Sequence, residues 1–120
     1  FARDLTGQLD VLVQSGDVPN PPDVYVRVFL LDGGGEELLL ETGDDESFDP
    51  RWGDEDPDAT VEHRLLPGAR LRVRVLDRDL VFDDPIGEVE AELPPLPRPG
   101  GVWTLEPFGQ VRRLVIRIDW

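Results

Sequence analysis

The fold of this chain is decided by residues 71–87, which read LRVRVLDRDLVFDDPIG. The first part alternates apolar and basic residues, as expected of a β-strand with one buried face. A second alternation follows, in which Val89, Ala91 and Leu93 are separated by glutamates. Residues 77–84 therefore form the tip between two paired strands, and this tip carries four carboxylates around three bulky apolar residues. A water-facing loop would normally be polar throughout, so this combination of acidic and apolar side chains needs an explanation.

Turn-forming residues divide the rest of the chain into short segments that alternate apolar and polar side chains. Prolines and glycines are concentrated in residues 15–22, 33–35 and 94–101, where they interrupt regular structure. No segment of useful length has the period of an amphipathic helix. The segments predicted as strands are residues 9–14, 24–31, 36–42, 59–66, 70–76, 86–93, 102–105 and 111–120, with a long acidic loop over residues 43–58. Eight short strands with regularly spaced turns predict an all-β fold, an eight-stranded antiparallel β-sandwich with Greek-key connections.

Length and composition limit what the chain can be. It has 120 residues, starts at Phe1 and contains no methionine, so we expect a single domain over residues 1–120 that belongs to a longer protein. Cysteine is absent, which excludes disulfides and thiolate metal ligands. No apolar run reaches the roughly 18 to 20 residues of a membrane span, so any membrane contact would be peripheral. The net charge of −14 argues against nucleic-acid partners. It fits adaptation to high salt, simple solubility or cation binding.

Groups for nucleophilic catalysis are scarce. The only histidine is His63, on a predicted strand, and the only serines are Ser15 and Ser47. The glycines at 33–35 belong to a hairpin turn and lack the Gly-Lys-Ser/Thr ending of a phosphate-binding loop. The three tryptophans are expected to pack in the core or at sheet edges. The chain is therefore predicted to be a binding module and not an enzyme.

Four motifs, in the right order along nearly the whole chain, resemble those of the C2 domain family. The matching segments are residues 23–26 (DVYV, similar to Asp-Pro-Tyr-Val), 49–55 (similar to Asn-Pro-x-Trp-Asn-Glu), 71–79 with 86–87 (Leu-x-Val-x-Val-x-Asp-x-Asp, then Ile-Gly) and 103–105 with 114–120. The resemblance implies the eight-stranded C2 sandwich in its second, circularly permuted topology. The chain opens on the strand before the first loop and ends on an extra strand, as that topology requires.

The resemblance also implies a calcium site at the end of the sandwich where the loops after the first and fifth strands meet. Calcium prefers about six to eight oxygen ligands, mostly from carboxylates and backbone carbonyls. Two carboxylates about 4 Å apart repel each other by about 4 kcal/mol at an effective dielectric near 20, so five that converge need a cation or protons. The aspartates whose spacing matches the family's ligands are Asp17, Asp23, Asp77, Asp79 and Asp84.

The sequence departs from the family pattern at three places. Val24 replaces the proline, and Asp49 and Gly53 replace asparagines. The third loop is also one residue shorter than in the calcium-binding members of the family. This shortening leaves open whether Asp84 or Asp83 supplies the last ligand.

Apolar residues beside these acids indicate a membrane partner. In calcium-dependent members of the family, the corresponding tip enters the lipid headgroup region once the metal has cancelled the local negative charge. The resemblance therefore implies calcium-dependent binding to an anionic or zwitterionic phospholipid surface, with the domain acting as a peripheral targeting module. The predicted membrane-contact residues are Leu80, Val81, Phe82 and Val18.

A second interpretation also fits the sequence. The loop acids would then be solvated and bind nothing, as we expect for Asp32, Asp44 and Asp45, whose turns should lie elsewhere on the sandwich. The chain would be a calcium-independent protein-interaction or structural β-sandwich with an acidic surface. Calcium binding is the interpretation that we favour.

Arginines follow one face of the strand at 70–76. The family's second lipid determinant, a lysine-rich patch on the third and fourth strands, is missing because the third strand is acidic and the chain contains no lysine. Arg70, Arg72 and Arg74 fit either pairing with acids on neighbouring strands or binding of phosphoinositides. We favour cross-strand pairing, which leaves the lipid headgroup preference open.

Overall fold

A computed structural model describes residues 3–4, 9–13, 22–52, 64–65, 68–79, 82–94 and 102–117. Its strands are β1 (Arg3–Asp4), β2 (Leu9–Val13), β3 (Asp23–Asp32), β4 (Gly35–Glu41), β5 (Asp45–Glu46), β6 (Arg51–Trp52), β7 (Arg64–Leu65), β8 (Arg70–Asp77), β9 (Asp84–Glu92), β10 (Val102–Leu105) and β11 (Val111–Arg117). All the strand pairs are antiparallel. The described part of the chain contains no helix with the length and hydropathy of a membrane span.

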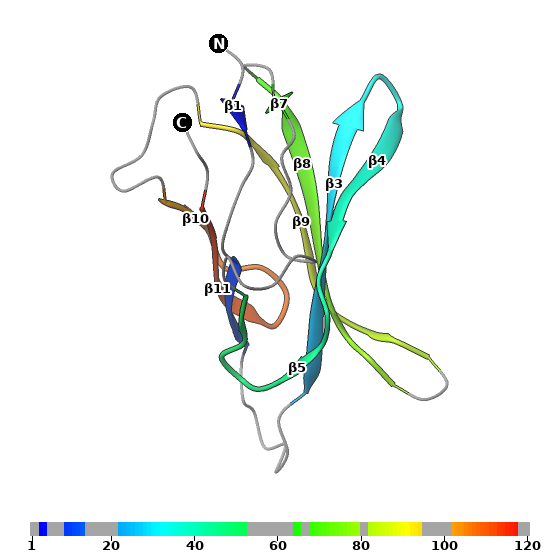
Figure 1. Ribbon diagram of the computed structural model, residues 1–120, viewed down its shortest axis with the longest axis vertical. Coiled ribbons are helices and arrows are strands. Elements are labelled where there is room, and N and C mark those ends of the chain that lie inside the picture. The colour runs from blue at the N-terminus through cyan, green and yellow to red at the C-terminus, as the bar shows by residue number, and fades with distance from the viewer. Residues whose placement is uncertain are drawn as a thin grey trace.

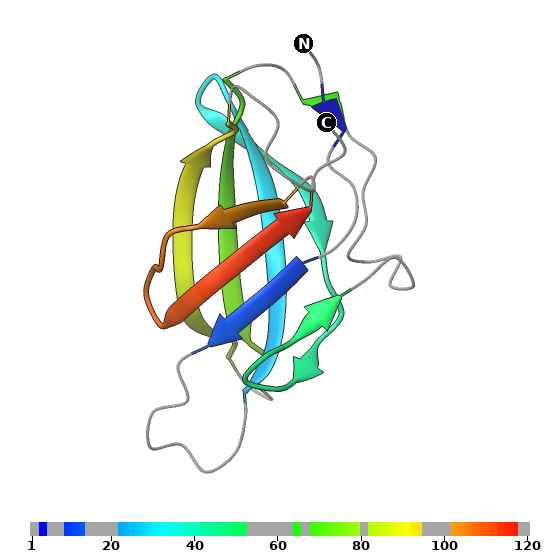
Figure 2. The ribbon, with the colours of Figure 1, turned by 90° about the vertical axis from the view of Figure 1, so that its left-hand side faces the viewer.

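Two sheets face each other across the core. One sheet has the strand order β4-β3-β8-β9, with β5 also paired to β3, and the other has the order β10-β11-β2-β6. Figure 1 shows the two layers edge-on, and Figure 2 shows β10, β11 and β2 crossing in front of β9, β8 and β3. The all-β sandwich is confirmed. The last strand, β11, pairs with β2 near the start of the chain.

Alternation in the sequence places the core. Val24, Val26 and Val28 of β3 are fully buried, and Val73 and Val75 of β8 pack beside them. The opposite sheet contributes apolar residues of β10 and β11, among them Trp103, Leu114 and Ile116. At about 25 cal/mol per Å² of apolar surface, these side chains supply most of the stabilisation of the fold.

The expected acidic loop over residues 43–58 is more regular than predicted. Residues Asp45–Glu46 pair with β3, and Arg51–Trp52 pair with β2. Trp52 is buried and donates a hydrogen bond from Nε1 to the carbonyl oxygen of Gly43, 3.0 Å away. The predicted strand at 59–66 lies largely outside the described residues, and its described part, Arg64–Leu65, pairs with β1.

Glycine is required where the turn before β11 closes over the start of β9. A Cβ on Gly87 would lie 2.9 Å from the carbonyl oxygen of Phe108, and a Cβ on Gly109 would lie 2.7 Å from that of Ile86. Gly109 also has a positive φ of 54°, which side chains other than hydrogen disfavour. The Ile-Gly pair of the motif therefore serves close packing at the base of the tip.

Candidate functional site

The candidate cation site lies where β3 begins, β8 ends and β9 begins. In the strand register Val24 is opposite Asp77, and Asp77 is opposite Asp84. Directly opposed residues of an antiparallel pair project from the same face, so Asp77 and Asp84 lie on the side of the sheet that carries the core. Of the predicted ligands, Asp23, Asp77, Asp79 and Asp84 are at this end, whereas Asp17 lies outside the described residues.

Two hydrogen bonds tie the start of β3 to the end of β8. The amide of Asp23 donates to Oδ1 of Asp77 at 2.9 Å, and the amide of Arg78 donates to the carbonyl oxygen of Asp23 at 2.8 Å. The side chain of Asp77 therefore already spans the start of β3 and the end of β8. The bond from the Asp23 amide fixes Oδ1 of Asp77, so this carboxylate cannot move away from the start of β3 without losing the bond.

Further acids lie beside Asp23, and sequence reasoning missed them. β5 places Glu46 opposite Asp23 and Asp45 opposite Val24, so the prediction that Asp44 and Asp45 lie elsewhere on the sandwich was wrong. The register of the β3–β4 hairpin explains why these acids lie beside Asp23. Because β4 runs antiparallel to β3 and ends with Glu41 opposite Arg27, the next few residues must return to the start of β3.

Partial burial and the neighbouring acids raise the pKa of the Asp23 carboxyl above its ordinary value. Partial burial is the largest cause, followed by repulsion and hydrogen bonding from Asp44 and by the charges of Glu46 and Asp77. A cation would remove this penalty on the charged form. The donor set therefore fits a hard cation in its chemistry, since it contains only oxygen ligands.

The described residues alone do not complete a metal site. No group of three or more acids or histidines within the described part of the chain is arranged to hold a metal ion. The prediction for the cation site therefore depends on Asp17, from the first loop, which is not described.

Arg78 is the one cation recorded against this acid cluster in the described residues. Its Nε lies 3.1 Å from Oδ1 of Asp44, and its guanidinium lies over the ring of Tyr25, 4.2 Å from the ring centroid. Arg27 approaches the same ring at 5.4 Å. These two arginines explain why Tyr25 is 1% exposed although it points away from the sandwich core.

Asp83 faces a different partner from the predicted ligands. The hydroxyl of Tyr25 donates to Oδ2 of Asp83, and the amide of Asp79 donates to Oδ1 at 3.2 Å. The bond from Tyr25 is the main cause that lowers the pKa of Asp83, with the Asp79 amide second. Burial and this same bond raise the pKa of Tyr25.

The described part of the predicted membrane tip is strongly exposed. Phe82 is 77% exposed, and Leu38 on β4, at 51%, is the other large hydrophobic residue that is exposed among those described. The remaining membrane-contact predictions, Leu80, Val81 and Val18, lie outside the described residues.

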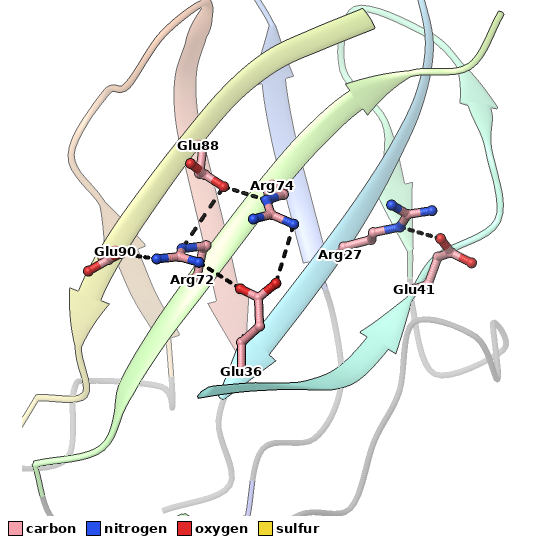
Figure 3. A network of polar contacts seen from close by, with 7 residues as sticks. All are labelled: Arg27, Glu36, Glu41, Arg72, Arg74, Glu88 and Glu90. Carbon is pink, nitrogen blue, oxygen red and sulfur yellow. Dashed lines mark hydrogen bonds and ion pairs between the residues drawn. The ribbon is translucent and has the colours of Figure 1, made fainter. Parts of the chain in front are cut away.

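The arginine face of β8 is neutralised by acids of its neighbours, as predicted (Figure 3). Arg72 binds Glu36 at 2.6 Å and also Glu90, and Arg74 binds Glu88 and lies 3.6 Å from Glu36. Hydrogen bonding to Arg72 lowers the pKa of Glu90. Cross-strand pairing of these arginines is thus confirmed, which leaves little free positive charge on this face for a phosphate.

Comparison with known proteins identifies the family. Residues 2–104 match the model of the C2 domain family, and the chain therefore belongs to that family. Members of it often bind calcium and lipids, and they are generally binding modules without catalytic activity. A search of curated protein sequences gave no match.

Solved structures share the fold. One, described as "Structure of a C2 domain", has a TM-score of 0.68 and 21% identity, with 100% of both chains covered. Human GIVD cytosolic phospholipase A2, in complex with methyl gamma-linolenyl fluorophosphonate, has a TM-score of 0.54 and 17% identity over 97% of this chain. A structure of the same phospholipase with that inhibitor and terbium chloride has a TM-score of 0.55 and 16% identity. The chain spans only 17% and 18% of those two phospholipase chains.

Proposed function

We propose that this C2 domain binds phospholipid membrane surfaces in a calcium-dependent manner and thereby targets a longer protein to them. One observation carries the proposal: an acid cluster and a strongly exposed Phe82 lie at the same end of the sandwich. An exposed phenylalanine gains free energy from an apolar surface, whereas the acids beside it oppose an anionic one. A cation bound by the acids would neutralise their charge, so that the phenylalanine could enter an anionic surface.

The proposed ligands are oxygen atoms from the two loops at residues 17–23 and 77–84. Asp77 and Asp84 are opposed in the strand register, and Asp23 is bound to Asp77 through its amide. The complete proposed set is Asp17, Asp23, Asp77, Asp79 and Asp84. Calcium at these residues would supply positive charge to the tip. Two or three ions change the net charge only from −14 to about −10 or −8, so attraction to the membrane is local to the tip.

The apolar tip supplies the membrane contact. Burying one phenylalanine side chain stabilises binding by about 1.5 to 3 kcal/mol. Leu80, Val81 and Val18 are proposed to contribute beside Phe82. The scarcity of groups for nucleophilic catalysis in the sequence supports a role as a binding module without catalytic activity.

Titration calorimetry with calcium tests the proposal. Saturable heat is expected for the wild-type domain and not for Asp77→Asn, which keeps the Oδ1 acceptor for the Asp23 amide and removes the charge. Asp32→Asn is the matched control, because Asp32 is an exposed aspartate at the β3–β4 turn, opposite Gly35 and far along β3 from Asp23. No heat from the wild-type domain at millimolar calcium contradicts the proposal.

The alternative is a calcium-independent protein-interaction or structural sandwich with an acidic surface. Its specific support is that the described residues bring no three acids into a metal-binding arrangement. Under this alternative, sedimentation with liposomes is the same with and without calcium. Stability would then respond to bulk salt and not to the identity of the divalent ion.

A further inference from the structure

Asp83 uses both of its carboxylate oxygens within the protein. Oδ2 accepts the hydroxyl of Tyr25, and Oδ1 accepts the amide of Asp79 at 3.2 Å. The bond to Asp79 joins the two described ends of the tip, four residues apart in sequence. The bond to Tyr25 joins the tip to β3, 58 residues earlier in the chain.

The partner of Asp83 is itself held firmly. Tyr25 is 1% exposed, and its ring is covered by the guanidinium groups of Arg78 and Arg27. Its backbone lies within β3, opposite Leu76 of β8. The hydroxyl is therefore presented from a rigid sheet and not from a loop. A bond from such a donor restricts the acceptor more than a bond between two loops would.

Asp83 and Asp84 project to opposite faces of the sheet. Asp84 is opposed to Asp77, which is opposed to the core residue Val24. Asp83 instead meets Tyr25, whose side chain is on the outer face. Side chains of adjacent residues in a strand project to opposite faces of the sheet. The carboxylate of Asp83 therefore projects outward, and that of Asp84 projects inward.

We propose that Tyr25 and Asp83 are positioning residues, which hold Phe82 outward and fix the base of the tip, and that Asp83 does not bind the metal. The effect of these two residues on lipid affinity rests on the proposed function. Both oxygens of Asp83 accept hydrogen bonds within the protein, and the bond from Tyr25 directs this carboxylate to the outer face, away from Asp77. Asp84, opposite Asp77 in the strand register, is not directed away in this manner.

Hydrogen exchange of the calcium-free domain tests the pairing by itself. Tyr25→Phe keeps the buried ring and removes only the hydroxyl that holds Asp83, so the amide of Asp79, which donates to Asp83, should exchange roughly two- to tenfold faster. Amides of Val73 and Leu114 in the core strands should be unchanged. Unchanged exchange at Asp79 would overturn the pairing, whatever the domain binds.

Calcium and lipid affinities then separate positioning from ligation. Calcium affinity by calorimetry should change less than about threefold in Tyr25→Phe and Asp83→Asn, and fall more than about tenfold in Asp84→Asn. Sedimentation with phosphatidylserine–phosphatidylcholine vesicles at saturating calcium should weaken roughly two- to tenfold in Tyr25→Phe. A loss of calcium affinity in Asp83→Asn equal to that in Asp84→Asn makes Asp83 a ligand and overturns the inference. A wild-type domain that binds no calcium contradicts the proposed function, while the exchange experiment still decides the pairing.

Discussion

The outer face of the β4-β3-β8-β9 sheet and the loop end of the same sheet are both rich in acid, but their charges are arranged differently. On the face, Glu36, Glu88 and Glu90 surround Arg72 and Arg74 on adjacent strands (Figure 3). At the loop end, Asp23 lies among other acids, and Arg78 is the cation recorded beside them in the described residues. The first arrangement neutralises itself, whereas the second gains from a cation supplied by the solvent.

This difference follows from how strands and loops place side chains. From Arg70 to Arg74 every second residue of β8 is an arginine, and β9 presents a glutamate opposite each one, so the register itself pairs the charges. The start of β3, the residues after β4 and the end of β8 have no such alternation. They meet because β3 begins near the place where β4 and β8 end. The strand register therefore does not pair the acids at the loop end with arginines.

The largest expected effect is on the calcium dependence of thermal stability. At calcium about 100-fold above Kd, binding to the folded state adds about 2.7 kcal/mol and raises Tm by about 10 °C. Asp77→Asn at the loop end should abolish this rise, whereas Glu36→Gln on the face should retain it. Differential scanning calorimetry at a series of calcium concentrations makes the measurement. An equal rise in both variants would show that the two regions do not differ in this respect.

The two exposed hydrophobic residues give the next comparison. Phe82→Asp should weaken calcium-dependent binding to vesicles about 10- to 100-fold, because about 1.5 to 3 kcal/mol of apolar burial is lost. Leu38→Asp, on β4, is the matched control and should leave binding within about twofold. Vesicle sedimentation at fixed calcium measures both. Equal losses would mean that the outer face contributes to the lipid contact as much as the tip does.

Much of this arrangement was predictable from local patterns, and the remainder depended on register. The alternation through Val73 and Val75 predicted β8, and the excess of glutamate on its neighbours predicted the pairing of Arg72 and Arg74. The positions of Asp44 and Asp45 were predicted wrongly, because composition made residues 43–58 look like one loop while their place depends on where β4 ends. The bond between Tyr25 and Asp83 spans 58 residues and two strand ends, and no local pattern encodes it.

A smaller effect is expected from breaking the paired face. Glu36 bridges Arg72 and Arg74, so Glu36→Gln removes two ion pairs at once and should lower the free energy of unfolding by about 1 kcal/mol. Urea denaturation of the calcium-free domain at pH 7 measures this loss. Glu37→Gln on the same strand is the control, since no ion pair is recorded for it among the described residues. A loss of equal size in the control would mean that the pairs on the face contribute nothing specific.

The smallest effect is a pair of opposite changes with pH. The folded protein raises the pKa of Asp23 above 3.8, so its charged form destabilises the fold at neutral pH, and this penalty disappears as the pH falls through the folded pKa. Glu90 has a lowered pKa, so its contribution is present above 4.5 and is lost as the pH falls below that value through the folded pKa. In urea titrations without calcium, Asp23→Asn should therefore unfold at higher urea than the wild type at pH 7, and Glu90→Gln at lower urea. Both differences should shrink near pH 3. In about 1 M salt, where the Debye length is about 3 Å, the parts that come from charge–charge interactions should shrink as well. The same sign for both variants would remove the distinction between a self-neutralised face and a loop end that lacks a cation.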